Sequence, residues 1–250
     1  MTFNILVTND DGVYSYGLKA LAREMRKIGN VYVVAPISEK SATGHSLTLH
    51  RPLRVKNIGR NHTYAVNGTP TDCVNLALNG LLKVRPQLVV SGINNGPNLA
   101  DDITYSGTVA AAIEATLLGV PAIAISIVGR KNLHYKPAQA IALKLVKKIM
   151  QEPLPPHILL NVNVPNLPEN KIKGYRFTRL GKRQYGDSII EKVDPRGEKY
   201  YWIGGDILGD EPIENSDVQA VRDGYISITP IQLDLTAYNF LKKLSKWDLS

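Results

Sequence analysis

Two adjacent carboxylates near the start of the chain are the first residues whose types and spacing indicate chemistry. Asp10 and Asp11 lie in the run Asn9-Asp10-Asp11-Gly12, directly after a short apolar segment. Side by side in a turn, two carboxylates repel each other by about 1 kcal/mol in water at about 4 Å, and by more when water is excluded. A bound cation removes that penalty, so the pair indicates a metal site. The alternative is a turn in which Asp10 or Asp11 caps the following helix.

Polar residues gather in the same way after two other apolar segments. One group follows the segment that ends at Ala35, and comprises Ser38, Ser41, Thr43, Gly44, His45 and Ser46. The other follows the segment that ends at Ser91, and comprises Asn94, Asn95, Asn98, Asp101 and Asp102. Carboxylate, amide and hydroxyl oxygens are hard ligands that suit Mg²⁺, Mn²⁺ or Ca²⁺ better than a thiolate-rich zinc site.

The run Ser106-Gly107-Thr108 opens an Ala-rich segment and indicates an anion site. Free backbone N–H groups and the helix dipole favour a phosphate at the start of a helix, and two hydroxyls add donors. Simple capping of the helix by Ser106 or Thr108 explains the run equally well, and the two interpretations are compatible.

Other candidate groups give weaker signals. His45 is a candidate acid or base, although a lone histidine in a polar loop is more often exposed, and His50 falls in an expected strand. Cys73 is expected to be a small buried residue. The chain has no Walker motif, no Gly-x-Gly-x-x-Gly and no Gly-x-Ser-x-Gly, so P-loop, dinucleotide-binding and α/β-hydrolase chemistry find no support.

These residues must be positioned by alternating strands and helices. Apolar runs predict buried strands, and residues at helical spacing predict the intervening helices. The strands expected are Phe3 to Thr8, Val31 to Ala35, Gln87 to Ser91, Val120 to Ser126 and Ile158 to Val164. The helices expected are one carrying Leu18, Leu21, Met25 and Ile28, then Asp72 to Leu82, Val109 to Leu118 and Ala138 to Met150. This alternation predicts an α/β fold with a Rossmann-like, doubly wound, mostly parallel sheet.

The pattern weakens near Pro165, which divides the chain into an α/β catalytic core over residues 1–165 and an extension over residues 166–250. In the extension we expect hairpin strands at Gly174 to Leu180 and Lys199 to Ile203, a returning strand at Tyr225 to Ile231, and a terminal helix at Thr236 to Trp247. Several basic residues between Lys171 and Lys199, Arg183 among them, are interpreted as a solvated face.

Composition narrows the class of protein. With 250 residues and 44% hydrophobic content the chain can bury a full core, which excludes a disordered or fibrous protein. The net charge of +8 favours anionic partners. No apolar run is long enough to cross a bilayer, and the first residues lack the features of a secretory signal, so we expect a cytoplasmic protein without membrane contact.

Several stretches together resemble the SurE family, the family of stationary-phase survival proteins and 5′-nucleotidases. The resemblance is carried by Ile5 to Gly12, Ser41 to Ser46, Gly68 to Val74, Ser91 to Asn98, Tyr105 to Val109, Asn161 to Pro165 and Gly224 to Pro230. Each motif alone is weak, but their order is specific and spans nearly the whole chain. One departure is Ile37, where family members often have Asp.

The resemblance implies roles for individual residues. Asp10, Asp11, Ser41 and Asn94 stand at the positions of the family's metal ligands, and would hold one divalent ion, Mg²⁺ or Mn²⁺, per subunit. The phosphate pocket would comprise Asn98, Ser106, Gly107 and Thr108, with Asn9, Thr43 and Gly44 beside them. The implied extension exchanges segments between subunits of a homodimer or homotetramer.

The function expected is a metal-dependent phosphomonoesterase, a 5′-nucleotidase resembling acid phosphatases, with Asp10 and Asp11 as catalytic residues. Nucleoside 5′-monophosphates are the expected substrates, with 3′-monophosphates and short polyphosphate as further ones. A covalent role for Asp10 is disfavoured, because aspartyl-phosphate enzymes usually carry Asp-x-Asp. The alternative from another class is a nucleotide- or RNA-binding regulator. A stacking platform for RNA is only slightly developed, at Tyr175, Arg176, Phe177 and Arg179. Nucleic acid is therefore a less favoured partner than a nucleotide.

Overall fold

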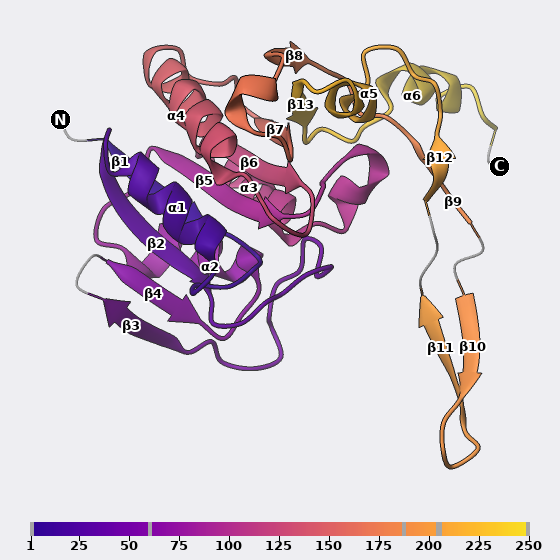
Figure 1. Ribbon diagram of the computed structural model, residues 1–250, viewed down its shortest axis with the longest axis horizontal. Helices are drawn as coiled ribbons and strands as arrows, with labels where there is room; N and C mark the ends of the chain where they lie inside the picture. The colour runs from indigo at the N-terminus through magenta and orange to yellow at the C-terminus, as the bar shows by residue number, and fades with distance from the viewer. Residues whose placement is uncertain (1–2, 60–61, 187–188, 204–206, 249–250) are drawn as a thin grey trace.

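The central feature of the protein is one mixed sheet, seen in a computed structural model that describes residues 3–59, 62–186, 189–203 and 207–248 (Figure 1). Within these residues nine strands pair in the order β3 (Val55–Gly59), β4 (Thr63–Val66), β2 (Asn30–Pro36), β1 (Asn4–Thr8), β5 (Leu88–Asn95), β6 (Ala122–Val128), β7 (Ile158–Pro165), β13 (Ile226–Gln232) and β8 (Tyr175–Phe177). The strands from β4 to β7 are parallel, whereas β3 and β13 run antiparallel to β4 and β7.

Helices cover both faces of this sheet because the strands are apolar on both sides. Ile5 and Val7 of β1 pack with α1 (Tyr16–Met25) and α4 (Tyr135–Gln151) in one core cluster. Leu6 points the opposite way and packs with α2 (Pro70–Leu76) and α3 (Gly107–Leu117) in a second cluster. The alternation follows from the two-residue period of a strand. The prediction of a doubly wound α/β fold is therefore confirmed.

The strand order reverses at β1, because the chain continues to β2 on one side of it and later returns to β5 on the other side. This reversal places a crevice at the centre of the sheet. Strand β2 lies on one side of β1 and β5 on the other, with Val7 opposite Val33 and Thr8 opposite Ser91. In doubly wound sheets, ligands bind beyond the carboxyl ends of the strands where the order reverses. The residues that follow β1, β2 and β5 therefore converge on one edge.

The expected core strands and helices are all present, with shifted ends. Strand β5 continues to Asn95, four residues past its expected end, so the Gly/Asn-rich loop starts later. That loop contains a 3₁₀ turn, Ala100–Thr104, that the sequence did not reveal. A π-helical turn, Ala77–Leu81, extends α2. The expectation of a strand at His50 is wrong: this residue lies in a loop, and the hairpin β3–β4 that follows was not predicted.

The extension continues the sheet and then leaves it. Strand β13 pairs with β7 over Ser227 to Gln232, so residues on both sides of Pro165 share one sheet. Two ribbons project from this body as an arm, formed by β9 (Arg183–Tyr185) with β12 (Ile207–Asp210) and by β10 (Ile189–Val193) with β11 (Lys199–Ile203). Figure 1 shows the arm reaching away from the sheet. A short 3₁₀ turn, Glu169–Lys171, and the helices α5 (Asp217–Arg222) and α6 (Tyr238–Leu244) complete the extension.

Four strands and one helix of the extension differ from expectation. Of the predicted strand Gly174 to Leu180, only Tyr175–Phe177 is strand. Strands β9, β10 and β12 and helix α5 were not predicted. In the part of the chain that the structure covers, no helix combines the length and apolar character required to cross a bilayer.

Candidate active site

The turn after β1 leaves its two carboxylates free of any helix-capping role. Ser15 caps α1, since its hydroxyl accepts the N–H of Leu18. The side chain of Asn9 braces the turn, because its Nδ2 donates to Ser15 Oγ at 2.8 Å and to Gly12 O at 3.3 Å. Capping was the main alternative to a metal site at Asp10 and Asp11, and the structure assigns it to Ser15 instead.

Asp10 is buried against the start of α3. Asp10 is 4% exposed, and its carboxylate accepts a hydrogen bond from Thr108 Oγ1. A Cβ added to Gly107 would lie 2.8 Å from Asp10 Cβ, so only glycine allows this approach of the helix start. Burial raises the pKa of Asp10 above its ordinary value, because the charged carboxylate loses hydration.

Asp11 is held from the other side, by the end of β5. The backbone N–H of Asn95 donates to Asp11 Oδ2 at 3.2 Å. Burial, and then the neighbouring charge of Asp10, raise the pKa of Asp11 to about 6. Both shifts report negative charge that is incompletely compensated by protein groups.

The loop after β2 packs directly against this turn. The N–H of Lys40 donates to the carbonyl of Asp10 at 2.8 Å, and Ser41 Oγ donates to Glu39 Oε1 at 2.6 Å. Thr43 Oγ1 donates to Lys40 O at 2.9 Å, which braces the loop internally. Gly44, at φ +57°, donates its N–H to Tyr105 O at 3.1 Å and so joins this loop to the one after β5.

The loop after β5 is fixed by an asparagine cluster. Asn94 Nδ2 donates to Gly96 O at 3.0 Å, which orients the side chain at the edge of the site. Asn98 is 6% exposed; its Nδ2 donates to Ser126 Oγ at 2.8 Å, and its N–H donates to Asn163 Oδ1 at 2.9 Å. Its carbonyl accepts Asn161 Nδ2 and Asn163 Nδ2, both at 2.8 Å. The ends of β6 and β7 thus anchor this loop.

At the start of α3, Ser106-Gly107-Thr108 caps the helix and also leaves room for an anion site, so the two interpretations of this run are compatible. Ser106 is the N-cap, and its hydroxyl accepts the N–H of Val109 at 3.1 Å. Thr108 turns its hydroxyl to Asp10 instead. The helix start therefore faces the carboxylates of the first turn, which is where a phosphate bridging a cation and a helix dipole would fit.

A cleft of about 770 Å³ joins the three loops. Five of the residues predicted to bind metal or phosphate line it: Asp10, Ser41, Asn94, Asn98 and Ser106. The rest of its wall consists of Glu39, Ala42, Asn95, Gly96, Pro97, Asp102, Tyr105, Arg130 and Arg183. Asp11, Gly107 and Thr108 contact members of this wall, whereas Asn9, Thr43 and Gly44 are not part of it.

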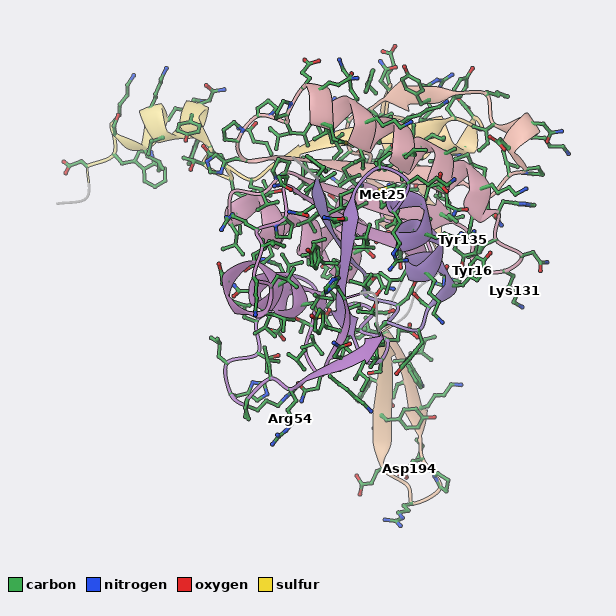
Figure 2. All side chains as sticks on the ribbon, turned by 90° about the vertical axis from the view of Figure 1, so that its left-hand side faces the viewer. Tyr16, Met25, Arg54, Lys131, Tyr135 and Asp194 are labelled. Atoms are coloured by element: carbon green, nitrogen blue, oxygen red, sulfur yellow. The ribbon has the colours of Figure 1, made fainter. Side chains whose placement is uncertain are left out.

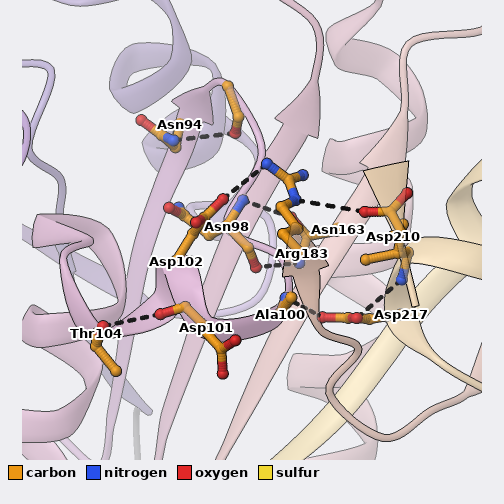
Figure 3. A network of polar contacts seen from close by, with 12 residues as sticks. Asn94, Asn98, Ala100, Asp101, Asp102, Thr104, Asn163, Arg183, Asp210 and Asp217 are labelled. Carbon is orange, nitrogen blue, oxygen red and sulfur yellow. Dashed lines mark hydrogen bonds and ion pairs between the residues drawn. The ribbon is translucent and has the colours of Figure 1, made fainter. Parts of the chain in front are cut away.

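Arg183 is the cleft residue that sequence reasoning placed wrongly. Expected on a solvated face, its side chain is 8% exposed, and its Nη1 donates to Asp102 Oδ2 at 2.7 Å (Figure 3). Its Nε lies 4.0 Å from Asp210 Oδ1. Arg183 begins the arm, so a residue of the extension reaches into the wall of the cleft.

Asp217 makes a second tie between the extension and the loop after β5. Its carboxylate is fully buried and accepts the N–H groups of Ala100 at 2.9 Å and Gly181 at 2.8 Å. Ala100 has φ +53°, a conformation unfavourable for a residue with a Cβ. The buried carboxylate therefore stabilises a strained backbone position in the active-site loop (Figure 3).

Two residues that the sequence raised lie outside the cleft wall. His45 Nε2 contacts Glu114 Oε2 at 2.8 Å, and this contact with the imidazole lowers the pKa of Glu114. Asn75 Nδ2 donates to the other oxygen of Glu114 at 2.7 Å. Ile37 is 47% exposed and is also absent from the wall. Cys73 is fully buried, as expected.

The donor set fits a hard divalent cation. No group of three or more His, Cys, Asp or Glu side chains is arranged as a metal site within the described ranges, so a zinc-type cluster is not seen there. Asp10, Asp11, Ser41 and Asn94 instead offer carboxylate, hydroxyl and amide oxygens, which Mg²⁺ and Mn²⁺ accept. Asn9 Oδ1, buried beside them, has no hydrogen-bond partner among the residues that the structure describes.

Known proteins resemble this chain along nearly its whole length. The family model of the survival protein SurE matches residues 5–187. The 5′-nucleotidase SurE of Geotalea uraniireducens is 56% identical over 247 residues, which cover 98% of this chain and 99% of that protein. The 5′-nucleotidase SurE of Geobacter sulfurreducens is 54% identical over 248 residues, covering 99% of this chain and 94% of its own.

A solved structure extends the likeness to three dimensions. A crystal structure of the SurE protein from Aquifex aeolicus matches with a TM-score of 0.87 and 44% sequence identity, over 97% of this chain and 98% of that chain. The sequence motifs, the doubly wound sheet and the match along nearly the whole chain agree, and we conclude that this chain belongs to the SurE family.

Proposed function

We propose that this chain is a metal-dependent phosphatase of nucleoside 5′-monophosphates, with 3′-monophosphates and short polyphosphate as further substrates. The observation that carries the proposal is the pair Asp10 and Asp11. Asp10 lines the cleft and Asp11 contacts its wall at Asn95, neither caps α1, and both have raised pKa values. Nucleotidase activity, and with it the class of phosphoric monoester hydrolases, is supported by relatives named 5′-nucleotidase SurE at 56% and 54% identity.

Asp10, Asp11, Ser41 and Asn94 would hold one divalent cation. When bound, such a cation neutralises phosphoryl charge and lowers the pKa of a coordinated water. Glu39 takes part indirectly, since it accepts the hydroxyl proton of Ser41 and so turns the lone pairs of that oxygen toward a ligand. In this proposal Asp10 or Asp11 orients the attacking water and accepts its proton.

The phosphate is bound at the start of α3, by the backbone N–H groups of Gly107 and Thr108 and by the side chains of Ser106 and Asn98. This placement brings the scissile phosphate to the carboxylates, because Gly107 and Thr108 contact Asp10 directly. Arg130 and Arg183 add positive charge to the cleft, which favours anionic substrates.

We also propose that the protein assembles as a homodimer or homotetramer through its extension. The arm exposes large apolar side chains, among them Trp202 at 61% and Ile203 at 87%. Leu241 of α6 is 54% exposed in the single chain. An arm this rich in exposed apolar side chains is typical of an association site.

The function is tested by phosphate release from 5′- and 3′-nucleoside monophosphates and short polyphosphate, with Mg²⁺, Mn²⁺ or a chelator. We expect release with either metal, none with chelator, and a loss of at least about a hundredfold in Asp10→Asn and Asp11→Asn. Asp223→Asn, on the surface beside Arg176, is the matched control and should retain full activity. Metal-dependent turnover by both active-site variants at the wild-type rate would contradict the assignment.

A further inference from the structure

We propose that Tyr135 is a positioning residue for the metal site, fixing the end of β5 relative to the turn after β1. The inference rests on the proposed function, because it assumes that Asp11 and Asn94 hold a cation. Tyr135 is the first residue of α4 and does not line the cleft itself. Its effect must therefore pass through residues that do.

Two hydrogen bonds in series connect Tyr135 to a carboxylate of the metal site. Its hydroxyl donates to Asn95 Oδ1 at 2.6 Å. The backbone N–H of the same asparagine donates to Asp11 Oδ2 at 3.2 Å. Asn95 is the last residue of β5 and follows Asn94, the proposed amide ligand. Restraining Asn95 thus restrains ligands from two loops at once.

The ring of Tyr135 makes a separate contact with helix α1, which follows the turn after β1. It packs against the ring of Tyr16 with centroids 4.7 Å apart, and Figure 2 shows the two residues side by side. Tyr16 begins α1, the helix that follows Asp10 and Asp11. The next residue, Gly17, leaves no space against β5, since an added Cβ would lie 2.0 Å from Ile93 O. Helix α1 and strand β5 are therefore in direct contact beneath the tyrosine pair.

This arrangement matters because the groups it restrains lie at the end of a strand. Asn95 is exposed and is the last residue of β5 to pair with β6, opposite Ile127, in a ladder that shifts register between Gly92 and Asn94. Metal sites require ligands fixed within about 0.5 Å, and removal of an outer hydrogen bond commonly weakens metal binding by about 10 to 100-fold. The Tyr135 hydroxyl is an outer hydrogen bond of this type.

The tyrosine pair supplies its own control. Tyr135→Phe and Tyr16→Phe each remove one hydroxyl from the same ring contact, but the Tyr16 side chain is 63% exposed and its hydroxyl makes no hydrogen bond within the residues that the structure describes. A general effect of lost packing or polarity would appear in both variants. An effect of positioning would appear only in Tyr135→Phe.

The test is calorimetric titration of Mn²⁺ into metal-free wild type, Tyr135→Phe and Tyr16→Phe. We expect Kd to rise about tenfold in Tyr135→Phe and to stay within about twofold in Tyr16→Phe. The activity of Tyr135→Phe should need more metal for half-maximal rate and recover at saturating metal. Equal Kd values for wild type and Tyr135→Phe, with wild type binding tightly, would overturn the role of Tyr135 alone. A wild type that binds no Mn²⁺ would overturn the proposed function as well.

A double-mutant cycle tests whether the Tyr135 hydroxyl acts through Asn95. Asn95→Ala removes the acceptor of the tyrosine hydroxyl and retains the N–H that Asp11 accepts. If the hydroxyl acts through Asn95, Tyr135→Phe should not weaken Mn²⁺ binding further in the Asn95→Ala background. Additive losses would show that Tyr135 acts by another route and would contradict the proposal.

Discussion

Asp11 illustrates how the proposed cation site behaves without a cation. Its pKa of about 6 lies above the ordinary value of 3.8, because burial and the charge of Asp10 disfavour the ionised form. A carboxyl group with a raised pKa in the folded state binds its proton more tightly there than in the unfolded chain. Its stabilising contribution is therefore complete below about pH 4 and is lost as the pH rises through about 6.

This linkage predicts the pH dependence of the metal-free protein. Between pH 4 and pH 7 the melting temperature of chelator-treated wild type should fall relative to that of Asp11→Asn, whose side chain cannot ionise. Thermal unfolding of both proteins across this range provides the measurement, and Mn²⁺ should restore the wild type at pH 7. Parallel melting curves for the two proteins would mean that Asp11 titrates normally.

Gly107 gives a second prediction for a single residue. Gly107→Ala places a Cβ 2.8 Å from that of Asp10, so the carboxylate or the start of α3 must move. We expect kcat/KM for a nucleoside monophosphate to fall by about a hundredfold, as when one donor to a transition state is lost. Gly80→Ala is the control, since nothing lies within 4 Å of its added Cβ. Full activity in Gly107→Ala would show that the helix start does not need this close approach.

The buried elements were predictable because each carries a local signal. Strands such as β1 and β5 are continuous apolar runs, and α1 has apolar residues at helical spacing. The hairpin β3–β4 was missed because most of β3 is exposed and lacks such a run. Helix α5, with six residues, is too short for a clear period, and the N–H that its Asp217 accepts belongs to a residue 117 positions away.

The residues of the candidate site were also predictable only where they carry a local signal. The two carboxylates and the helix start are contiguous motifs, so Asp10, Asp11 and Ser106 could be identified from the sequence. The place of Arg183 in the cleft wall could not be predicted, because its partner Asp102 lies 81 positions away and a basic residue in a charged stretch is usually solvated. The capping question was also open until the structure placed Ser15 at the start of α1.

The tie between α5 and the active-site loop leads to a prediction for Asp217. Asp217→Asn replaces an acceptor oxygen with an amide that cannot accept from Ala100 and Gly181 together. The free energy of unfolding should fall by about 2 kcal/mol, and KM should rise as the loop loosens. Urea unfolding and steady-state kinetics measure the two effects.

The control is Asp223→Asn, in a half-exposed pair with Arg176, which should lower the free energy of unfolding by less than about 1 kcal/mol. Similar small losses in both variants would remove Asp217 from this role.

The whole molecule is asymmetric, with a packed sheet and an arm that has little core of its own. The side chains of β10 and β11 are exposed on both faces of their ribbon, and none belongs to the three core clusters. The large apolar side chains of this ribbon are removed from water, and so contribute to stability, only if another chain covers them.

The arm therefore leads to a prediction about assembly. Trp202→Glu combined with Ile203→Glu should lower the molar mass measured by light scattering after size exclusion, because charges would be forced into the apolar contact. The circular dichroism of the sheet should remain unchanged, since the arm lies outside the core. Lys192→Glu, on the same ribbon, is a charge-changing control. An unchanged molar mass in the double variant would exclude the arm as the contact between chains.

The central claim, a single hard cation between the loops that follow β1, β2 and β5, is tested most directly by anomalous diffraction from crystals grown with Mn²⁺. The account predicts one manganese peak per chain, bound by oxygens of Asp10, Asp11, Ser41 and Asn94 at about 2.0 to 2.5 Å. No peak at these residues, or a peak held by other side chains while the protein hydrolyses a nucleoside monophosphate, would contradict it.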